Sequence, residues 1–192
     1  PAVYRYETKP GVQAQVDWAE CGYIDIDGEK RKLYCFTIVL GYSRMRYAEF
    51  TLRMDVFTLI QCHINAFQYF GGYPQELLYD NITQIVKKRA LKSSDSTWNP
   101  RYQDFFEHYG FIPRLCRPYR PQTNGKVERF HRILLEEWAY IRPWHSDRQR
   151  TAAYARFIHF YNHHRSHGAL EWRSPIATLT HLAGDNLPAD HS

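Results

Sequence analysis

The sequence predicts an α/β fold in which a mixed five-stranded sheet is flanked by helices. Three observations support this prediction. The first part of the chain alternates apolar and polar residues with the period of two that strands show. Apolar residues then recur at helical spacing, and short apolar runs alternate with helical segments further on. At 192 residues, the chain suits one domain with a buried core, or one domain with a short appended helix or tail.

The first part of the chain predicts an antiparallel meander of three strands. Residues 12–20 alternate well enough for a strand that contains Asp17, and an Asp-Gly pair after it predicts a hairpin turn. Residues 32–40 are largely apolar and β-branched, which predicts a central buried strand. Residues 46–52 follow a further turn and predict the third strand.

The rest of the chain alternates between helices and short strands. Helices are predicted at residues 56–70, at 100–109, from residue 123 or 124 to about 141, and at 147–163. Short strands are predicted at residues 76–79 and 111–115. A polar and basic segment at 86–98 predicts a mobile loop, and the proline-containing tail from residue 164 predicts looser structure.

This order of elements, β-β-β-α-β-α-β-α-α, matches the ribonuclease-H-like architecture. Such a sheet is antiparallel at first and then parallel, with helices on both faces. In open α/β sheets, sites form at the carboxyl ends of strands, and Asp80 occupies such an end. We divide the chain into a core at residues 1–145 and a C-terminal helix and tail, residues 146–192, appended to that core.

The distribution of charge indicates the kind of partner that the protein binds, and the cysteines indicate the compartment in which it works. The net charge is +5, but residues 114–132 hold six Arg or Lys residues against Glu128 as the only acid, which indicates a polyanionic partner, first of all nucleic acid. No apolar run approaches the roughly 20 residues that cross a bilayer, so no membrane partner is expected. The absence of an initiator Met suggests a fragment. Reduced thiols in a cytoplasm are expected, because the cysteines are scattered singly: Cys21, Cys35, Cys62 and Cys116.

The candidate catalytic and metal-binding residues are Asp17, Asp80 and Glu128. Cleaving or joining a phosphodiester requires stabilisation of the attacking and the leaving oxygen, which two Mg²⁺ ions about 3.5–4 Å apart can provide. Mg²⁺ prefers oxygen ligands and usually takes one or two carboxylates, so three carboxylates suffice when one bridges the metals. Asp17 is the expected bridge because it lies within a strand. Mn²⁺ is the expected substitute for Mg²⁺.

Residues 117–132 resemble the final catalytic motif of bacterial insertion-sequence transposases in the retroviral-integrase superfamily. The specific part is the Pro-x-x-Asn-Gly-x-x-Glu pattern that ends at Glu128. Residues 15–18 resemble the first-aspartate strand of that family, residues 78–81 resemble the second, and residues 161–167 with Ser174-Pro175 are similar to the segment that follows the catalytic core. The resemblance implies an aspartate–aspartate–glutamate triad at the three carboxylates. The longer interval between Asp80 and Glu128 is assigned to an insertion at 86–98.

The same resemblance implies the activity and the partners. It implies a Mg²⁺-dependent polynucleotidyl transferase that cuts DNA at transposon ends and joins those ends to target DNA, as a homo-oligomer on the DNA. The resemblance also makes an ATPase helper a candidate partner, because some bacterial relatives work with one. This chain has no GxxxxGK[ST] loop, so such an ATPase would be a separate protein. The expected location is the bacterial cytoplasm, at the nucleoid when the protein is on DNA.

Basic residues around Glu128 are the candidate DNA contacts. Arg132 lies four residues beyond Glu128 and His131 three, on the same helical face. The predicted DNA-binding set is Arg117, Arg120, Lys126, Arg129, His131 and Arg132. The alternative is that these side chains only form the solvent-exposed face of a helix and do not contact DNA. For the histidines at 159, 163 and 167, packing or DNA contact is favoured over a metal site.

Two other functions remain alternatives. A ribonuclease-H-like nuclease or resolvase would use the same three carboxylates, but the Asn-Gly motif and the basic helix argue against it. A catalytically silent DNA-binding or assembly module would keep the fold without the reaction. The presence of all three carboxylates disfavours this second alternative.

Overall fold

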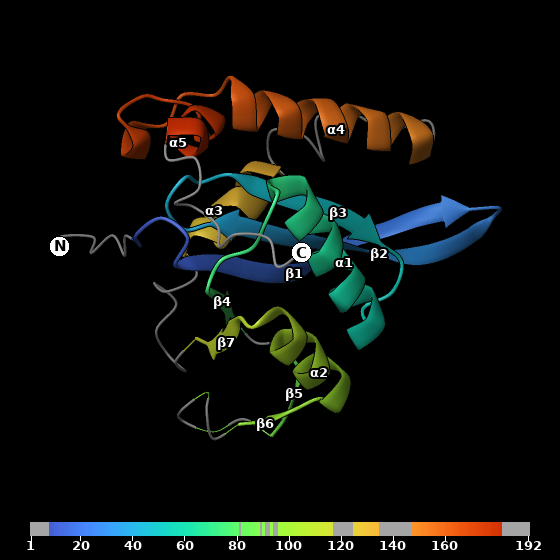
Figure 1. The fold of residues 1–192 in the computed structure, drawn as a ribbon. Coiled ribbons are helices and arrows are strands. Elements are labelled where there is room, and N and C mark those ends of the chain that lie inside the picture. The colour runs from blue at the N-terminus through green and yellow to red at the C-terminus, as the bar shows by residue number, and fades with distance from the viewer. Residues whose placement is uncertain are drawn as a thin grey trace, which may run out of the picture.

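The structure is a computed structural model, which describes residues 8–181 except residues 81, 89, 91–92, 94–95, 117–124 and 135–146. Its main sheet has the strand order β3-β2-β1-β4-β7 (Figure 1). These strands are β1 (Gln13–Ile26), β2 (Glu29–Leu40), β3 (Arg46–Thr51), β4 (Glu76–Tyr79) and β7 (Ile112–Leu115). The helices are α1 (Val56–Phe70), α2 (Pro100–Tyr109), α3 (Gly125–Leu134), α4 (Asp147–His163), α5 (Pro175–His181) and the short 3₁₀ helix η4 (Gly168–Leu170).

The sheet is mixed, as the sequence predicts. β1 pairs antiparallel with β2, and β2 pairs antiparallel with β3. β1 pairs in parallel with β4, and β4 pairs in parallel with β7. Chain reversals after β1 and β2 explain the antiparallel half, whereas α1 and α2 provide the crossovers that parallel strands require.

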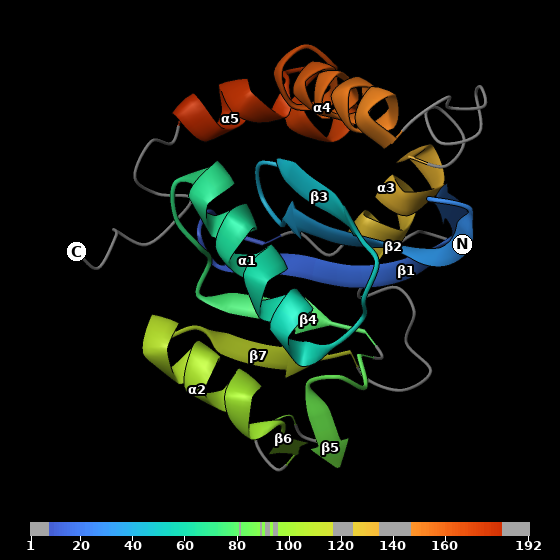
Figure 2. The ribbon, with the colours of Figure 1, turned by 90° about the vertical axis from the view of Figure 1, so that its right-hand side faces the viewer.

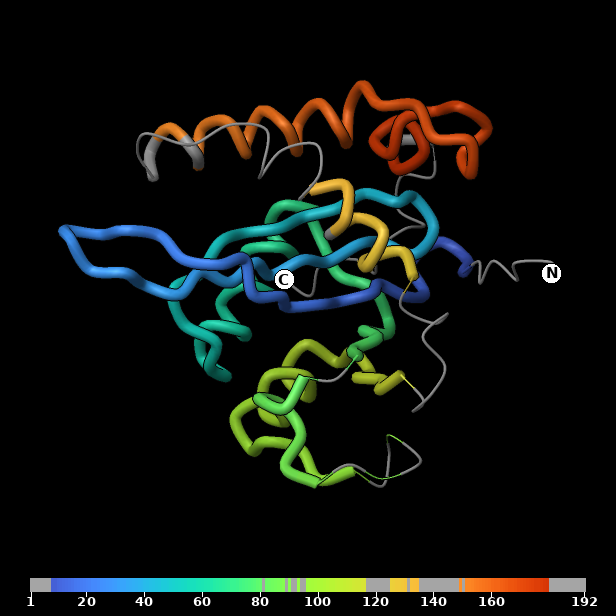
Figure 3. The backbone as a smooth tube through the Cα atoms, turned by 180° about the vertical axis from the view of Figure 1, so that it is seen from behind, coloured from blue at the N-terminus to red at the C-terminus, as the bar shows by residue number. Residues whose placement is uncertain are grey.

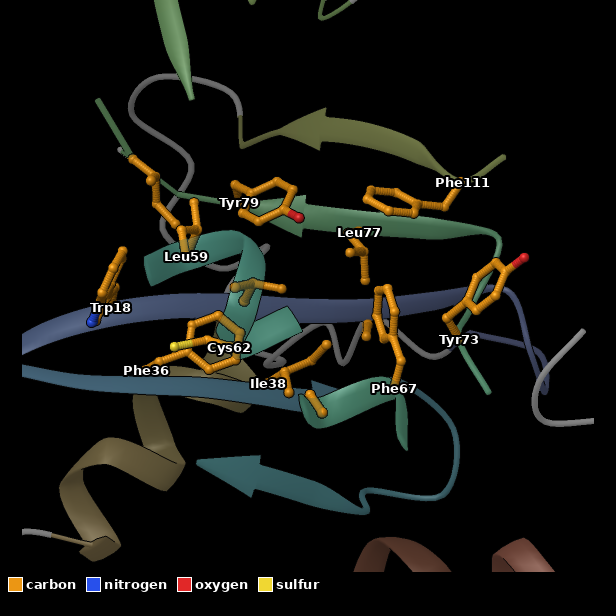
Figure 4. Packing of buried hydrophobic residues seen from close by; sticks show 14 of the residues in the cluster. Trp18, Phe36, Ile38, Leu59, Cys62, Phe67, Tyr73, Leu77, Tyr79 and Phe111 are labelled. Carbon is orange, nitrogen blue, oxygen red and sulfur yellow. The ribbon is translucent and has the colours of Figure 1, made fainter. Parts of the chain in front are cut away.

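Alternating residues of the strands divide the core between the two faces of the sheet. On one face, Trp18, Phe36 and Ile38 pack with side chains of α1 and β4 (Figure 4). Tyr102 and Phe105 of α2 belong to the same cluster. On the other face, Cys35 and Val39 pack with α3 and α4. Figure 2 shows α1 and α3 on opposite sides of the strands. The helices contribute Val127, Phe130, Leu134, Tyr154, Ile158 and Tyr161 to this second cluster.

Helices α1 and α2 have the predicted limits because their capping residues are in the sequence. The Asp55 carboxylate accepts a hydrogen bond from the Thr58 amide at 2.9 Å, which satisfies an amide at the start of α1. Asn99 caps α2 in the same way. Each helix ends at a glycine with positive φ, Gly71 after α1 and Gly110 after α2.

The first hairpin is longer than predicted. β1 continues through a bulge between Glu20 and Tyr23, and the distal half of the β1–β2 hairpin projects beyond the neighbouring strands (Figure 3). The predicted turn is correct: Asp27 and Gly28 both have positive φ, 53° and 81°, as a two-residue type I′ turn requires.

Two segments predicted to lack regular structure contain some. Within residues 86–98, β5 (Val86–Lys88) pairs with β6 (Thr97–Trp98). The Ser93 hydroxyl accepts a hydrogen bond from the Leu115 amide at 2.9 Å, so the segment contacts the end of β7. The tail contains α5, which begins at Pro175 because proline suits a first helical position. The predicted ends of the α3 helix lie outside the described residues.

Candidate active site

Asp17 lies on the face of the sheet that α3 covers. Its neighbours Val16 and Trp18 are buried against the α1 side, and strand alternation directs Asp17 to the opposite side. Asp17 pairs with Thr37 of β2, and Thr37 is completely buried. Asp17 itself is half-buried, within the rigid centre of the sheet.

Asp80 follows β4 directly, next to Asp17. Val16 of β1 pairs with Tyr79 of β4 in parallel register, so Asp17 and Asp80 are the next residues on two adjacent strands. Neighbouring strands lie about 4.8 Å apart. Asp80 is exposed, as expected at a carboxyl end of a parallel strand.

A buried chain of hydrogen bonds holds the end of β4 in place. The Tyr102 hydroxyl donates to the Tyr79 hydroxyl, which lies 2.8 Å from Nε2 of His63. Nδ1 of His63 lies 2.7 Å from the Leu59 carbonyl oxygen. Burial lowers the pKa of His63 to about 4, so the ring is neutral and can accept the Tyr79 proton. The residue before Asp80 is therefore fixed to both α1 and α2.

Glu128 belongs to the first turn of α3, and Gln15 attaches that turn to β1. The side-chain oxygen of Gln15 accepts hydrogen bonds from the backbone amides of Lys126 at 3.0 Å and Val127 at 3.4 Å. Val127 is completely buried, whereas Glu128 is exposed beside it. Because Gln15 and Asp17 point to the same face of β1, the start of α3 lies on the side of the sheet that holds Asp17.

The negative charge of Asp17 contributes to the raised pKa of the Cys35 thiol. The pKa of Cys35 is raised well above its ordinary value, first by a hydrogen bond with Cys21, then by burial, and further by the negative charges of Cys21 and Asp17. Cys35 belongs to the hydrophobic cluster under α3 and α4.

The three carboxylates are carried by neighbouring elements, but they do not form a ready metal site. In the described part of the chain, no group of three or more His, Cys, Asp or Glu residues is placed to hold a metal ion. The histidines of α4 are no exception among the described residues. The ring centres of His159 and His163 lie 4.2 Å apart, and the two rings are stacked. The chemistry of the set nonetheless fits Mg²⁺, because all its ligands are carboxylate oxygens.

The predicted DNA contacts have different places in the structure. Arg129 and Arg132 are exposed on α3. Lys126 is half-buried, and its ammonium group donates to the Gly41 carbonyl oxygen at 2.9 Å, which helps to attach α3 to the sheet. The side chain of His131 and both residues Arg117 and Arg120 lie outside the described part.

Gln15 is the structural residue of the site that sequence reasoning missed. A glutamine within an apolar strand was the available signal, because a buried polar side chain needs a hydrogen-bond partner. That signal does not name the partner. The contact joins residues 111 positions apart.

A family model described as integrase core domain matches residues 7–121, and a second model with the same description matches residues 109–175. The chain belongs to the integrase core domain family. This assignment confirms the resemblance derived from the three motifs.

Curated relatives of this integrase core domain are insertion-sequence transposases. The chain is 48% identical over 134 residues to the putative transposase for insertion sequence element IS5376 of Geobacillus stearothermophilus, covering 70% of this chain and 33% of the relative. It is 34% identical over 136 residues to the transposase for IS21 of Pseudomonas aeruginosa, covering 70% of this chain and 34% of the relative. The chain thus spans about a third of the length of these relatives.

Solved structures show the same fold at low sequence identity. The catalytic core domain of BIV integrase matches with a TM-score of 0.62 and 18% identity, covering 89% of this chain and 95% of that core. The HTLV-2 integrase catalytic core domain in complex with magnesium matches with a TM-score of 0.60 and 14% identity, covering 90% of this chain and 99% of that core. The predicted ribonuclease-H-like fold is confirmed. Within the described residues, none of the helices has the length and apolar character needed to span a membrane.

Proposed function

We propose that this integrase core domain cuts DNA at the ends of an insertion sequence and transfers the freed strand to target DNA. Asp17, Asp80 and Glu128 are the proposed catalytic residues. The observation that carries the proposal is the parallel pairing of Val16 with Tyr79, because it makes the two aspartates neighbours on adjacent strands. The hydrogen bonds of Gln15 to the first turn of α3 add the helix of Glu128 on the same face.

The proposed cofactor is a pair of Mg²⁺ ions, with Mn²⁺ as a substitute. Asp17, Asp80 and Glu128 would hold them, with Asp17 shared between the two. Bound there, the metals would activate the attacking hydroxyl and stabilise the leaving oxygen of the phosphodiester. The HTLV-2 integrase catalytic core domain, which has this fold, forms a complex with magnesium, and this supports the same choice of metal here. Without metal, the negative charges of the three carboxylates repel one another, and this repulsion favours separated side chains.

DNA is the proposed partner, at both the transposon ends and the target. Arg129 and Arg132 are exposed on the helix of Glu128 and are proposed phosphate contacts, together with Arg117, Arg120 and His131. Lys126 belongs to the same proposed set, and its ammonium group also donates to the Gly41 carbonyl oxygen, which helps to attach α3 to the sheet. A homo-oligomer on the DNA, a separate ATPase helper and a cytoplasmic location in a bacterium belong to the same proposal. Residues 1–145 are the proposed catalytic core and residues 146–192 its appended C-terminal part.

The test is a strand-transfer assay with a labelled DNA duplex that has a free 3′-hydroxyl, in Mg²⁺, in Mn²⁺ and in chelator. The variants are Asp17→Asn, Asp80→Asn and Glu128→Gln, each of which removes a charge with little change in shape. Asp27→Asn is the matched control, because asparagine tolerates the left-handed backbone that Asp27 adopts at φ 53°.

Joined products that need metal and all three carboxylates, and that persist in the Asp27 variant, would establish the proposed reaction. Nicked DNA without joined products would favour the nuclease or resolvase alternative. DNA binding without any metal-dependent chemistry would favour the silent DNA-binding or assembly module. Parallel loss of DNA binding and of folding in a triad variant would remove that residue from the catalytic assignment.

A further inference from the structure

Two arginines and a histidine surround one buried aromatic ring on the α3 and α4 side of the sheet. The ring is Tyr161 of α4, and the guanidinium carbons of Arg46 and Arg165 lie 3.9 Å and 4.8 Å from its centre. The centre of the His167 ring lies 5.0 Å from the same point. The Arg46 guanidinium also lies 4.5 Å from the ring centre of Phe130 on α3, so two aromatic rings fix its position.

Two nitrogen atoms of this cluster are buried without a hydrogen-bond partner. Arg46 is only 5% exposed, and its Nε donates to the Arg44 carbonyl oxygen at 3.2 Å. Its Nη1 has no partner, and neither has Nε2 of His167. A buried polar group without a partner is strongly unfavourable, and a buried charge more so. The cluster therefore offers hydrogen-bonding capacity to an incoming group.

Four arginine side chains act electrostatically on the ring of His167. Burial lowers the pKa of His167 most, and the positive charges of Arg46, Arg165, Arg44 and Arg129 add to the effect, so that the pKa is about 4. Burial also lowers the pKa of Arg46 to about 10, with Tyr161 opposing that change and Arg165 and Arg44 adding to it. Cations from β3, α3 and the end of α4 repel one another when they converge in this way, and a bound anion would relieve the repulsion.

We propose that Arg46, Arg165 and His167 form a phosphate-binding site, which takes a phosphodiester of the DNA backbone. A guanidinium presents a planar fork of donors that matches phosphate oxygens, and the aromatic contacts hold two such forks in place before binding. Arg165 and His167 are half-buried and would make the direct contacts, while Arg46 acts from the interior. The choice of DNA as the source of the phosphate rests on the proposed function.

The position of the site relates it to the candidate active site. Arg129, whose charge acts on His167, follows Glu128 directly in α3 and is exposed. A DNA strand that passes Glu128 would therefore reach the phosphate site along the same helix. The site would position DNA and would take no part in the chemical step.

The first test measures phosphate binding without catalysis. Inorganic phosphate is added to the metal-free protein while the imidazole resonances are followed by NMR across pH. We expect phosphate to shift the His167 resonance and to raise its pKa from about 4 towards the ordinary 6.5, because an anion favours the protonated ring. Arg165→Gln should weaken phosphate binding about tenfold. A His167 resonance that phosphate leaves unchanged would overturn the proposal.

The second test measures binding of a labelled DNA duplex as salt is raised, again without divalent metal. We expect Arg165→Gln to weaken DNA binding about tenfold and to lower the slope of log affinity against log salt by about 0.9, the value for one phosphate contact. Arg173→Gln is the matched control, because Arg173 is exposed in the same segment and its guanidinium pairs with Glu171 at 2.9 Å. Equal effects of the two variants on DNA affinity and on its salt dependence would overturn the proposal.

The two tests also separate the source of the phosphate and the role of the site. Inorganic phosphate that binds in an Arg165-dependent way, with DNA binding unaffected by the same substitution, would overturn the assignment to DNA. His167→Gln is a second variant, and thermal unfolding of both variants establishes that each is folded. Because neither test uses catalysis, loss of strand transfer in Asp17→Asn bears on the proposed function alone.

Discussion

The side-chain oxygen of Gln15 accepts a hydrogen bond from the backbone amide of Lys126 at 3.0 Å. This bond joins the strand of Asp17 to the helix of Glu128. It also satisfies one of the amides at the start of α3 that have no partner within the helix. The side chain of Gln15 therefore links the strand of Asp17 to the helix of Glu128 without any metal.

Substitution Gln15→Met should loosen this link. The change keeps the size of the side chain but removes the acceptor, so we expect a loss of about 1–3 kcal/mol in the free energy of unfolding. Strand transfer should fall more than the fraction of folded protein, because Glu128 loses its fixed position. Urea denaturation and single-turnover strand transfer measure the two effects.

Gln13→Met is the control for that substitution. Gln13 is also buried and points to the same face of β1, but its amide nitrogen contacts the Glu76 carboxylate at 3.4 Å and not α3. Equal losses of strand transfer in the two variants would mean that the contact with α3 has no special role.

Local sequence signals predicted much of the fold. Asp55, Asn99 and the glycines that follow α1 and α2 made the limits of those helices readable, because caps act over a few residues. The β5–β6 pair had no such signal, since strands of three and two residues are too short to show a periodic pattern. The proline at the start of α5 does not identify the helix, because proline is common in irregular segments and also suits the first position of a helix.

The candidate site was predictable only as a set of motifs. Asp17, Asp80 and Glu128 follow from short patterns, and the register of β1 with β4 agrees with neighbouring aspartates. The contacts that hold these three residues in place could not be predicted from the sequence, because they join residues that are far apart along the chain. Gln15 lies 111 positions from Lys126, and the backbone amide of Arg46 lies 116 positions from the Asn162 side chain that accepts its hydrogen bond. Such pairs have no signature within a local window.

Mg²⁺ should stabilise the folded chain. Asp17, Asp80 and Glu128 repel one another without a cation, and a ligand that binds only the folded state adds about 1.4 kcal/mol at ten times its dissociation constant. Thermal unfolding with and without Mg²⁺ measures this gain. Chelator, Asp17→Asn and Glu128→Gln should each remove it, and Asp27→Asn should keep it. A gain of equal size in every variant would indicate general ionic effects instead of a site.

His63 should make the fold sensitive to acid. The pKa of His63 is about 4 in the folded state because of burial, against 6.5 ordinarily. Between these values the unfolded chain binds a proton that the folded chain does not, so stability is complete above pH 6.5 and falls as the pH approaches 4. The loss from this residue is on the order of 3 kcal/mol, at 1.36 kcal/mol per pKa unit. Urea denaturation from pH 7.5 to 4.5 measures it.

The variant His63→Gln isolates that contribution from the carboxylates that titrate in the same range. The glutamine carbonyl can still accept the Tyr79 hydroxyl proton but does not titrate. We expect a lower stability at pH 7.5 and a shallower fall towards pH 4.5 than in the unsubstituted protein. His167→Gln is the comparison for a half-buried histidine, for which solvent reduces the effect. Parallel curves for His63→Gln and the unsubstituted protein would contradict the assignment.

Asn162 should hold α4 against the edge of the sheet. It is completely buried, its amide nitrogen donates to the Arg46 carbonyl oxygen at 2.8 Å, and its side-chain oxygen accepts the Arg46 amide at 3.2 Å. Asn162 thereby pairs with the start of β3 as a neighbouring strand would. Asn162→Ala leaves both backbone groups of Arg46 buried without partners, so we expect a loss of roughly 2–4 kcal/mol in the free energy of unfolding. Asn65→Ala, which removes a half-buried bond to Glu49, should cost under about 1 kcal/mol. Equal losses in the two variants would show that α4 is held by its apolar contacts alone.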